Sequence, residues 1–238
     1  MSKTYNITAL ELGPMENFIH LIQDSESKRT AIVDPAWDVP SILDTAKRCN
    51  MDITDILITH SHHDHINGIE GVLEQTDAQL HILKAELDFW GQQLPKPAIH
   101  HGGDHIKLGK TDIQILHTPG HTPGSACYLL DDDILTGDTL FVYGCGKCSL
   151  AGGDPEVMYH TLQKMAAELP SNTEIFPGHN YAIRPRSSMA EQISGNPFLH
   201  LKNLPDFIHY RMDIHDHVRE DPYGPETPEA TQACLHDH

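Results

Sequence analysis

One short stretch decides the fold: Thr59-His60-Ser61-His62-His63-Asp64-His65. An apolar run over residues 53–58 precedes it and predicts a buried strand. Ile66, Ile69 and Val72 follow it at the spacing of one helix face. Four histidines and one aspartate are therefore expected on the loop between the end of a strand and the start of a helix.

The residue types of this loop are those of a metal site. His60 and His62 are two positions apart, so in an extended segment both side chains project to the same side and can hold one ion. Asp64 and His65 come after the turn begins and can face a second ion beside the first. Imidazole and carboxylate ligands suit zinc, iron or manganese. Desolvating so many titratable groups without a metal is costly, which makes packing alone a poor explanation.

Composition narrows the class of protein. The chain has 238 residues, enough for one large domain with a small appendage, and a formal net charge of −18 from 16 Lys and Arg against 34 Asp and Glu. That charge argues against nucleic acid or another polyanion as partner. No apolar run has the length of a membrane span, and the N-terminus lacks the pattern of a signal peptide. The five cysteines are odd in number and irregularly spaced, so we expect a cytoplasmic protein without a disulfide framework.

The pattern of apolar residues predicts strands and helices in two successive halves. In the first half, strands are expected at 5–10, 18–22, 30–33 and 79–83, and Asp38 has the residue type of an N-cap for a helix that continues to Cys49. In the second half, short runs over residues 100–141 predict hairpins. A helix then begins at Asp154-Pro155, and a strand follows at 173–176. Two such halves predict two sheets packed together with helices outside.

Three further segments share one form, a strand end followed by a Gly/Pro turn with a potential ligand. They are residues 118–124 with His121, residues 136–139 with Asp138, and residues 176–181 with His179. Loops at strand ends are where a sheet scaffold usually presents its chemistry. A glycine beside each ligand lets the backbone approach a crowded site closely.

The ordered set resembles the full ligand set of the metallo-β-lactamase fold. Within that superfamily the chain looks most like glyoxalase II, the hydroxyacylglutathione hydrolase, on the segments GDTLF at 137–141, GCGK at 144–147 and GHNY at 178–181. The resemblance implies an α/β (α+β) architecture. Its expected form is a four-layer αββα sandwich of two mixed β-sheets with outer helices, followed by a short C-terminal helical extension.

The resemblance also divides seven ligands between two divalent metal ions, with zinc preferred and iron or manganese as alternatives. One ion takes His60, His62 and His121, and the other takes Asp64, His65 and His179. Asp138 bridges the two ions, and His63 is not a ligand.

The expected chemistry is thioester hydrolysis. A metal ion lowers the pKa of bound water from about 15.7 towards 7, which supplies hydroxide at neutral pH. The resemblance implies that this hydroxide, oriented by Asp64 and Asp138, attacks the carbonyl of a small-molecule thioester such as an S-acylglutathione. A thiolate leaves readily because thiol pKa values lie near 8.5. No nucleophilic serine or cysteine is then required.

Substrate contacts are expected from Lys147 and Tyr181, which match family positions that contact glutathione. The alternative for the pair is a solvated lysine and a half-buried aromatic ring. Ser149 stands where the family usually has an aromatic residue, and the C-terminal helical region is shortened, which leaves the thiol carrier open. Cys145 and Cys148 form a C-x-x-C in a loop that the family already uses, which favours a structural role over a redox role.

The domain organisation follows from the same patterns. We expect a catalytic domain over residues 1–181 and a short helical extension over residues 182–218. The last stretch, residues 219–238, has three prolines and few large apolar residues, and a poorly ordered tail is expected there. The oligomeric state is left open.

The main alternative function is an oxidoreductase. The segments SSMAE at 187–191 and NPFL at 196–199 resemble persulfide dioxygenases, which share the fold but bind a single iron through two histidines and an aspartate. Here those ligands would be His60, His121 and Asp138. Three further functions are less consistent with the sequence. The net charge disfavours a nuclease of the superfamily, and the absence of an export signal disfavours a β-lactamase. The intact ligand set disfavours a non-catalytic binding module.

Overall fold

Two six-stranded mixed sheets form the centre of the molecule, which the computed structural model describes over residues 3–237. Residues 1, 2 and 238, the outermost parts of the expected domain and tail, lie outside the described residues. In the first sheet the strands follow chain order, antiparallel from β1 to β3 and parallel from β3 to β6. These strands are β1 (Tyr5–Leu12), β2 (Asn17–Asp24), β3 (Arg29–Val33), β4 (Asp52–Leu57), β5 (Gln79–Leu83) and β6 (Ala98–His100).

The second sheet has the order β12-β11-β10-β9-β8-β7. Its neighbours are antiparallel except for the parallel pair β10 and β11. The strands are β7 (His105–Leu108), β8 (Thr111–His117), β9 (Ala126–Leu130), β10 (Asp133–Gly137), β11 (Glu174–Pro177) and β12 (Ser187–Ser188).

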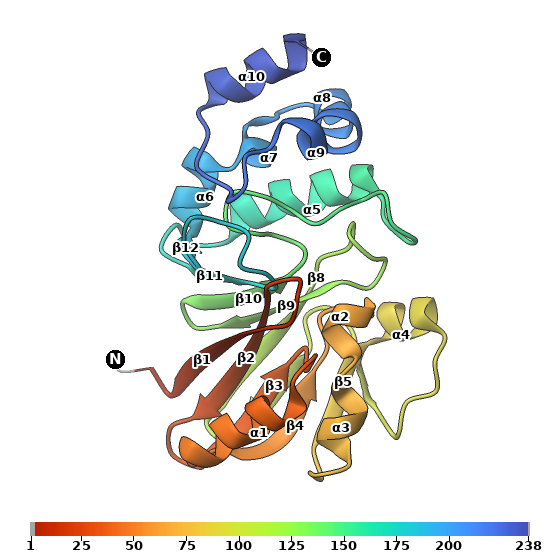
Figure 1. Cartoon of the computed structure of the whole chain (residues 1–238), viewed down its shortest axis with the longest axis vertical. Coiled ribbons are helices and arrows are strands. Elements are labelled where there is room, and N and C mark those ends of the chain that lie inside the picture. Colours follow the sequence, from red (N-terminus) through yellow and green to blue (C-terminus); the bar gives the residue numbers. More distant parts are fainter. Residues whose placement is uncertain (1–2, 238) are drawn as a thin grey trace.

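Helices cover the outer faces of both sheets (Figure 1). The first sheet is accompanied by α1 (Val39–Arg48), α2 (His63–Ile66), α3 (Ile69–Leu73) and α4 (Lys84–Trp90), and the second by α5 (Pro155–Glu168). The four-layer sandwich of two mixed sheets with outer helices that the sequence predicts is therefore confirmed. Two elements of the first half, α4 and β6, were not predicted from the sequence.

Local sequence explains where the two longest helices of the sandwich begin. The Asp38 carboxylate accepts a hydrogen bond from the Ser41 backbone N–H at 3.1 Å and caps α1. Asp154 caps α5 in the same way, through two backbone N–H groups of the first turn, and Pro155 occupies the first helical position. Both N-caps agree with the sequence-based prediction.

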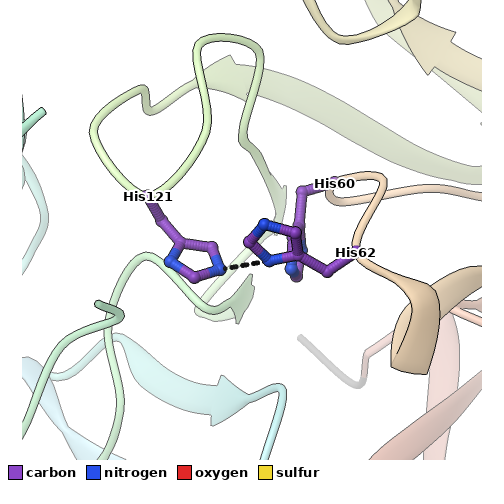
Figure 2. A group of neighbouring side chains, drawn as sticks. All are labelled: His60, His62 and His121. Atoms are coloured by element: carbon purple, nitrogen blue, oxygen red, sulfur yellow. Dashed lines mark hydrogen bonds between the residues drawn. The ribbon is translucent and has the colours of Figure 1, made fainter. Parts of the chain in front are cut away.

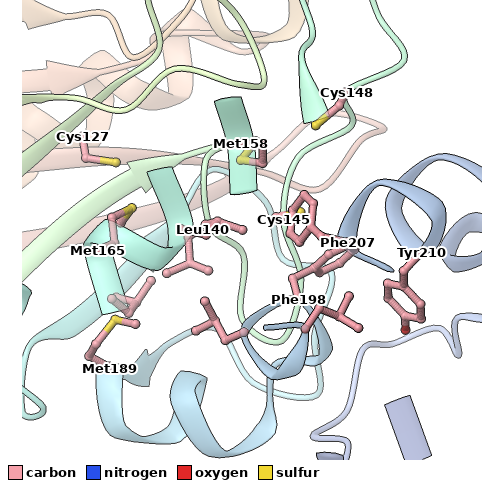
Figure 3. Close-up of a cluster of buried hydrophobic side chains, with 14 of the residues drawn as sticks. Cys127, Leu140, Cys145, Cys148, Met158, Met165, Met189, Phe198, Phe207 and Tyr210 are labelled. Atoms are coloured by element: carbon pink, nitrogen blue, oxygen red, sulfur yellow. The ribbon is translucent and has the colours of Figure 1, made fainter. Parts of the chain in front are cut away.

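Three large buried clusters hold the layers together. Leu57 of β4 and Tyr128 of β9 belong to the cluster between the two sheets. Ile42 of α1 belongs to the cluster between the first sheet and its helices. Met158 of α5 and Phe198 belong to the third cluster, which joins the second sheet to α5 and the C-terminal helices (Figure 3). Since each sheet is covered on both faces, its central strands are apolar on both sides.

The C-terminal region is a series of short helices beyond α5 (Figure 1). They are α6 (Met189–Gly195), α7 (Pro197–His200), α8 (Leu204–His209), the π-helix η1 (Tyr210–Ile214), α9 (His215–Val218) and α10 (Pro228–Asp237). None of the helices within residues 3–237 combines the length and the apolarity needed to cross a membrane.

The last described stretch, residues 219–237, packs against the other C-terminal helices. This segment contains α10, and it buries Tyr223 and Thr231. Thr231 Oγ1 lies 3.1 Å from Nδ1 of the buried His200, and Cys234 and Leu235 pack against the third cluster. A few well-placed contacts hold this segment against the rest of the chain although its overall composition is polar.

Candidate metal centre

The predicted ligands converge at one end of the sandwich, where strands of both sheets terminate. His60 and His62 follow β4, and His121 lies in the loop between β8 and β9. Asp138 follows β10, and His179 follows β11. Parallel neighbouring strands end at the same edge of a sheet, which brings together residues that are more than 100 positions apart in the chain.

The first group consists of His60, His62 and His121, whose ligand atoms all lie within 4.8 Å of one another. Figure 2 shows the three rings directed at a common point between the loop after β4 and the loop before β9. His62 Nδ1 lies 2.9 Å from His121 Nε2. His60 and His121 are buried, and His62 is partly accessible.

The second group consists of Asp64, His65 and His179, again with ligand atoms within 4.8 Å. His65 Nε2 and His179 Nε2 are 3.2 Å apart, and each lies 3.4 Å from Asp64 Oδ2. Asp138 lies between the two groups. Its Oδ2 is 3.4 Å from His179 Nε2 and 3.6 Å from His121 Nε2.

Hydrogen bonds on the far side of the rings fix which nitrogen faces the site. Thr59 Oγ1 donates its only proton to Asp34 Oδ2 at 2.6 Å, so it accepts from His60 Nδ1 at 2.9 Å. The Nε2 lone pair of His60 therefore faces the site. Three more rings are oriented by an Nδ1–H that points away from the site. His65 donates to Asp34 Oδ2 at 3.0 Å. His121 donates to the backbone oxygen of Lys147 at 2.7 Å, and His179 donates to the backbone oxygen of Met15 at 2.8 Å.

Electrostatics favour the ligand forms of His60, His121 and Asp138, whereas burial lowers the pKa of His65 but the carboxylates around it raise the value more. Burial lowers the pKa of His60 well below its ordinary value and that of His121 to about 4, so both rings are neutral at pH 7. Burial raises the pKa of Asp138, but the neighbouring His179 and His65 lower it more, and the net result is well below the usual range. Neutral imidazoles and ionised carboxylates are the forms that bind a divalent ion.

The residues fit a metal centre. His60 Nε2 is buried yet forms no hydrogen bond with any residue in the described part of the chain. A buried polar atom without a partner is costly, and a metal ion would satisfy it. The donor set is imidazole and carboxylate, with no thiolate in either group, which suits zinc, iron or manganese. His63 is exposed, lies edge-on to Trp37 and belongs to neither group.

Three supporting residues were not identified from the sequence. Asp34 receives hydrogen bonds from Thr59 and His65. Asn17 donates to both the backbone oxygen and Oδ2 of Asp64, and Glu86 contacts the loops of the first group. Asp34 could have been identified as a candidate site residue from the sequence, because it directly follows β3, the strand beside β4.

A cavity of about 410 Å³ opens over the ligands. Lys147 and Tyr181, the predicted substrate contacts, both line it. The ring of Tyr181 also stacks on His179, with centroids 4.6 Å apart and an interplanar angle of 10°. Tyr181 therefore contacts a predicted ligand as well as the cavity.

The lining of the cavity includes a group of charged residues that we call the charged wall: Lys147, Arg211, Asp216 and Arg219. Lys147 Nζ lies 3.7 Å from Asp216 Oδ2, and Arg211 pairs with the same carboxylate. Two other C-terminal arginines, Arg184 and Arg186, do not line the cavity and form ion pairs with Glu191 and Glu174.

The two cysteines of the C-x-x-C are buried. Cys145 and Cys148 belong to the third apolar cluster (Figure 3). Burial raises the pKa of the Cys145 thiol to about 12, and burial likewise raises that of Cys148. Thiols of this kind are poor nucleophiles at neutral pH, which supports the structural role.

Comparison with known families agrees with this arrangement. Residues 12–179 match the family model of the metallo-beta-lactamase superfamily, and the chain belongs to that superfamily. The match includes every predicted ligand, from His60 to His179.

Similar proteins bear two kinds of name. A protein of Bacillus velezensis named as a probable polyketide biosynthesis zinc-dependent hydrolase, BaeB, is 32% identical over 213 residues, covering 89% of this chain and 95% of that protein. A hydroxyacylglutathione hydrolase of Pseudomonas entomophila is 36% identical over 174 residues, covering 71% of this chain. The match spans 63% of the length of that hydrolase.

Solved structures confirm the fold over almost the whole chain. ETHE1 from Myxococcus xanthus superposes with a TM-score of 0.80 at 26% identity, covering 98% of this chain and 100% of that one. TTHA1623, in a di-iron-bound form, superposes with a TM-score of 0.69 at 26% identity, covering 81% of this chain and 100% of that one.

Proposed function

We propose that this protein is a metal-dependent thioester hydrolase of the glyoxalase II type that holds two divalent ions, with zinc the preferred metal. The observation that carries the proposal is the presence of two adjacent ligand groups with Asp138 between them. His60, His62 and His121 would hold one ion, and Asp64, His65 and His179 the other. Asp138 would contact both.

The comparisons support a hydrolase in two ways. The similar hydroxyacylglutathione hydrolases act, by name, on an acyl thioester of glutathione. The similar polyketide-biosynthesis proteins are named as zinc-dependent hydrolases and match this chain over nearly their full length. Thioester hydrolysis would be consistent with both sets of names, whereas the thiol carrier would differ between them.

The chain's own residues would orient the reactants. A bound divalent ion supplies water of lowered pKa and polarises a carbonyl oxygen. The carboxylates of Asp64 and Asp138 are ionised at neutral pH, because neighbouring histidines lower their pKa values more than burial raises them. Each can therefore accept a hydrogen bond from the attacking water and direct its lone pair at the thioester carbon.

The cavity would bind the remainder of a small-molecule thioester. Lys147 and Tyr181 are proposed to contact the thiol part, remote from the bond that breaks. We expect the protein to work in the cytoplasm on a small molecule, with neither nucleic acid nor a membrane as partner. The net charge of −18 supports the exclusion of polyanions.

A mononuclear-iron persulfide dioxygenase is the second candidate. The structural match to ETHE1 over 98% of this chain favours it, since that match extends through the C-terminal helices. In that case His60, His121 and Asp138 would hold the metal, and His179 would be dispensable for metal binding.

Substrate tests distinguish the two functions. Purified protein is assayed for thiol release from S-acylglutathiones and from acyl thioesters of other thiols, and for oxygen uptake with glutathione persulfide. The hydrolase proposal predicts thiol release without oxygen uptake. Oxygen uptake with no thioester cleavage across the panel would contradict it.

A further inference from the structure

Glu86 is a fully buried carboxylate beside the metal centre that contacts no metal-site atom itself. It lies in α4, and its side chain is 0% exposed. It forms no ion pair within residues 3–237, so its charge is stabilised by hydrogen bonds alone. A buried charge held in this way is costly, which makes its role worth identifying.

All four donors to Glu86 come from the two loops that carry the first ligand group. Oε1 accepts from the backbone N–H and the hydroxyl of Ser61, both at 2.6 Å. Oε2 accepts from the Thr122 hydroxyl at 2.7 Å and the Gly124 N–H at 3.1 Å. One carboxylate therefore joins the loop after β4 to the loop between β8 and β9.

The position of Ser61 explains how this contact reaches the ligands. In an extended segment alternate side chains point to opposite sides, so Ser61 points away from the site while His60 and His62 point into it. Thr122 directly follows His121. Glu86 thus holds each loop from behind, at the residue adjacent to a ligand.

We propose that Glu86 is a positioning residue that sets the separation of His62 and His121 and so controls metal affinity at the first ligand group. The second group, Asp64, His65 and His179, has other supports in Asn17 and Asp34 and does not depend on Glu86. The inference rests on the proposed two-ion centre. Its test measures zinc binding without turnover, so a failure here is distinct from a failure to cleave thioesters.

Glu86→Gln is the informative change. Glutamine keeps the size of the side chain, but one acceptor oxygen becomes an NH₂ donor that faces donors from one of the two loops. Asp24 provides a matched control. It is likewise 0% exposed and accepts hydrogen bonds from Ser27 and Thr111 far from the metal centre, so Asp24→Asn removes a similar buried charge.

Two backgrounds separate the ligand groups. His179→Ala disables the second group and leaves the first, whereas His62→Ala does the reverse. Metal-free protein in each background is titrated with zinc against a chromophoric chelator, and circular dichroism and thermal unfolding monitor the fold.

In the His179→Ala background, Glu86→Gln is expected to weaken zinc binding about 10- to 100-fold, the usual effect of losing a group that orients a ligand. In the His62→Ala background it should leave zinc affinity unchanged. Asp24→Asn should lower the unfolding temperature but leave zinc affinity unchanged in both backgrounds. Unchanged zinc affinity of Glu86→Gln in the His179→Ala background, or equal weakening in both backgrounds, would overturn the proposal.

If Glu86→Gln does not fold, Thr122→Val and Ser61→Ala keep the inference testable, because each removes a single hydroxyl donor. Each is expected to weaken zinc binding at the first group about 2- to 10-fold, which corresponds to the net contribution of one typical hydrogen bond. Wild-type affinity in both of these variants would overturn the proposal.

Discussion

Two parts of the cavity lining are built differently, the predicted ligands and the charged wall. The ligands sit directly at strand ends, and hydrogen bonds to neighbouring loops orient His60, His65, His121 and His179. The charged wall is built from one loop and the C-terminal helices, and its charges largely pair with one another. The side chain of Lys147 is 51% exposed, in contrast to 1% for His179.

This difference suggests that the predicted ligands determine the reaction and that the charged wall determines substrate specificity. A rigid, buried centre can serve the same reaction in many relatives, since its geometry does not depend on the substrate. Exposed side chains such as that of Lys147 can change partners at low cost, so the accessible part of the charged wall is where substrates would be distinguished. Changes at the ligands should therefore abolish function, and changes at the wall should adjust it.

The largest effect is expected from Asp138→Ala. Asp138 lies between both ligand groups, so its loss should abolish turnover and reduce metal content, while the protein stays folded because the residue is not part of an apolar cluster. Metal analysis, circular dichroism and a thioester assay check these outcomes together. Full activity in this variant would exclude the bridging assignment.

Asn17→Ala should have the next largest effect. Asn17 Nδ2 donates to Asp64 Oδ2 at 3.0 Å, and its Oδ1 accepts from Trp37 Nε1 at 2.8 Å, so it anchors the Asp64 carboxylate. Loss of this contact should weaken zinc binding at the second group about 10- to 100-fold. Zinc titration in the His62→Ala background measures it. The exposed Asn6→Ala serves as control, and equal affinities of the two variants would contradict the anchoring role.

Substitutions of Tyr181 test a residue that contacts both a predicted ligand and the cavity. Tyr181→Leu removes the stack on His179 and should weaken zinc binding about 2- to 10-fold, because aromatic pairs contribute about 0.5–1.5 kcal/mol. Tyr181→Phe keeps the stack and should leave zinc affinity unchanged, while KM rises through loss of the hydroxyl contact. If the two variants behave alike in both measurements, Tyr181 does not have these two separable roles.

Lys147→Ala should give the smallest effect. Lys147 is half exposed and already near Asp216, so we expect KM for a glutathione thioester to rise by no more than about fivefold, in keeping with about 0.2–1 kcal/mol for an exposed ion pair. The value of kcat should not change, because the contact is remote from the reacting bond. The exposed Lys164→Ala is a matched control. An unchanged KM would indicate a different thiol carrier.

The contrast between the predicted ligands and the charged wall also explains which features could be predicted from the sequence. His60, His121, Asp138 and His179 each lie shortly after a strand, and the last three directly follow a glycine, so their signal is local. The strands and capped helices of the sandwich have equally local signals in their apolar spacing. The two-sheet architecture followed from these elements together with the resemblance to the superfamily.

The supporting residues and the charged wall depend on distant contacts. Glu86 meets Ser61 and Thr122, which are 25 and 36 positions away, and no periodic pattern links them. Arg211 lines the cavity because η1 and the surrounding helices pack against the third cluster. The burial of Tyr223 and Thr231 likewise depends on partners elsewhere in the chain, which the polar composition around them does not indicate.

Metal stoichiometry is the most direct test of the central claim, that two ligand groups converge on Asp138 to form a two-ion centre. Untagged protein, purified without added metal, is analysed for zinc, iron and manganese, alongside His179→Ala. A two-ion centre predicts two ions per chain in the wild-type protein and one in the variant. One iron per chain, retained in full by His179→Ala, would contradict it and favour the dioxygenase.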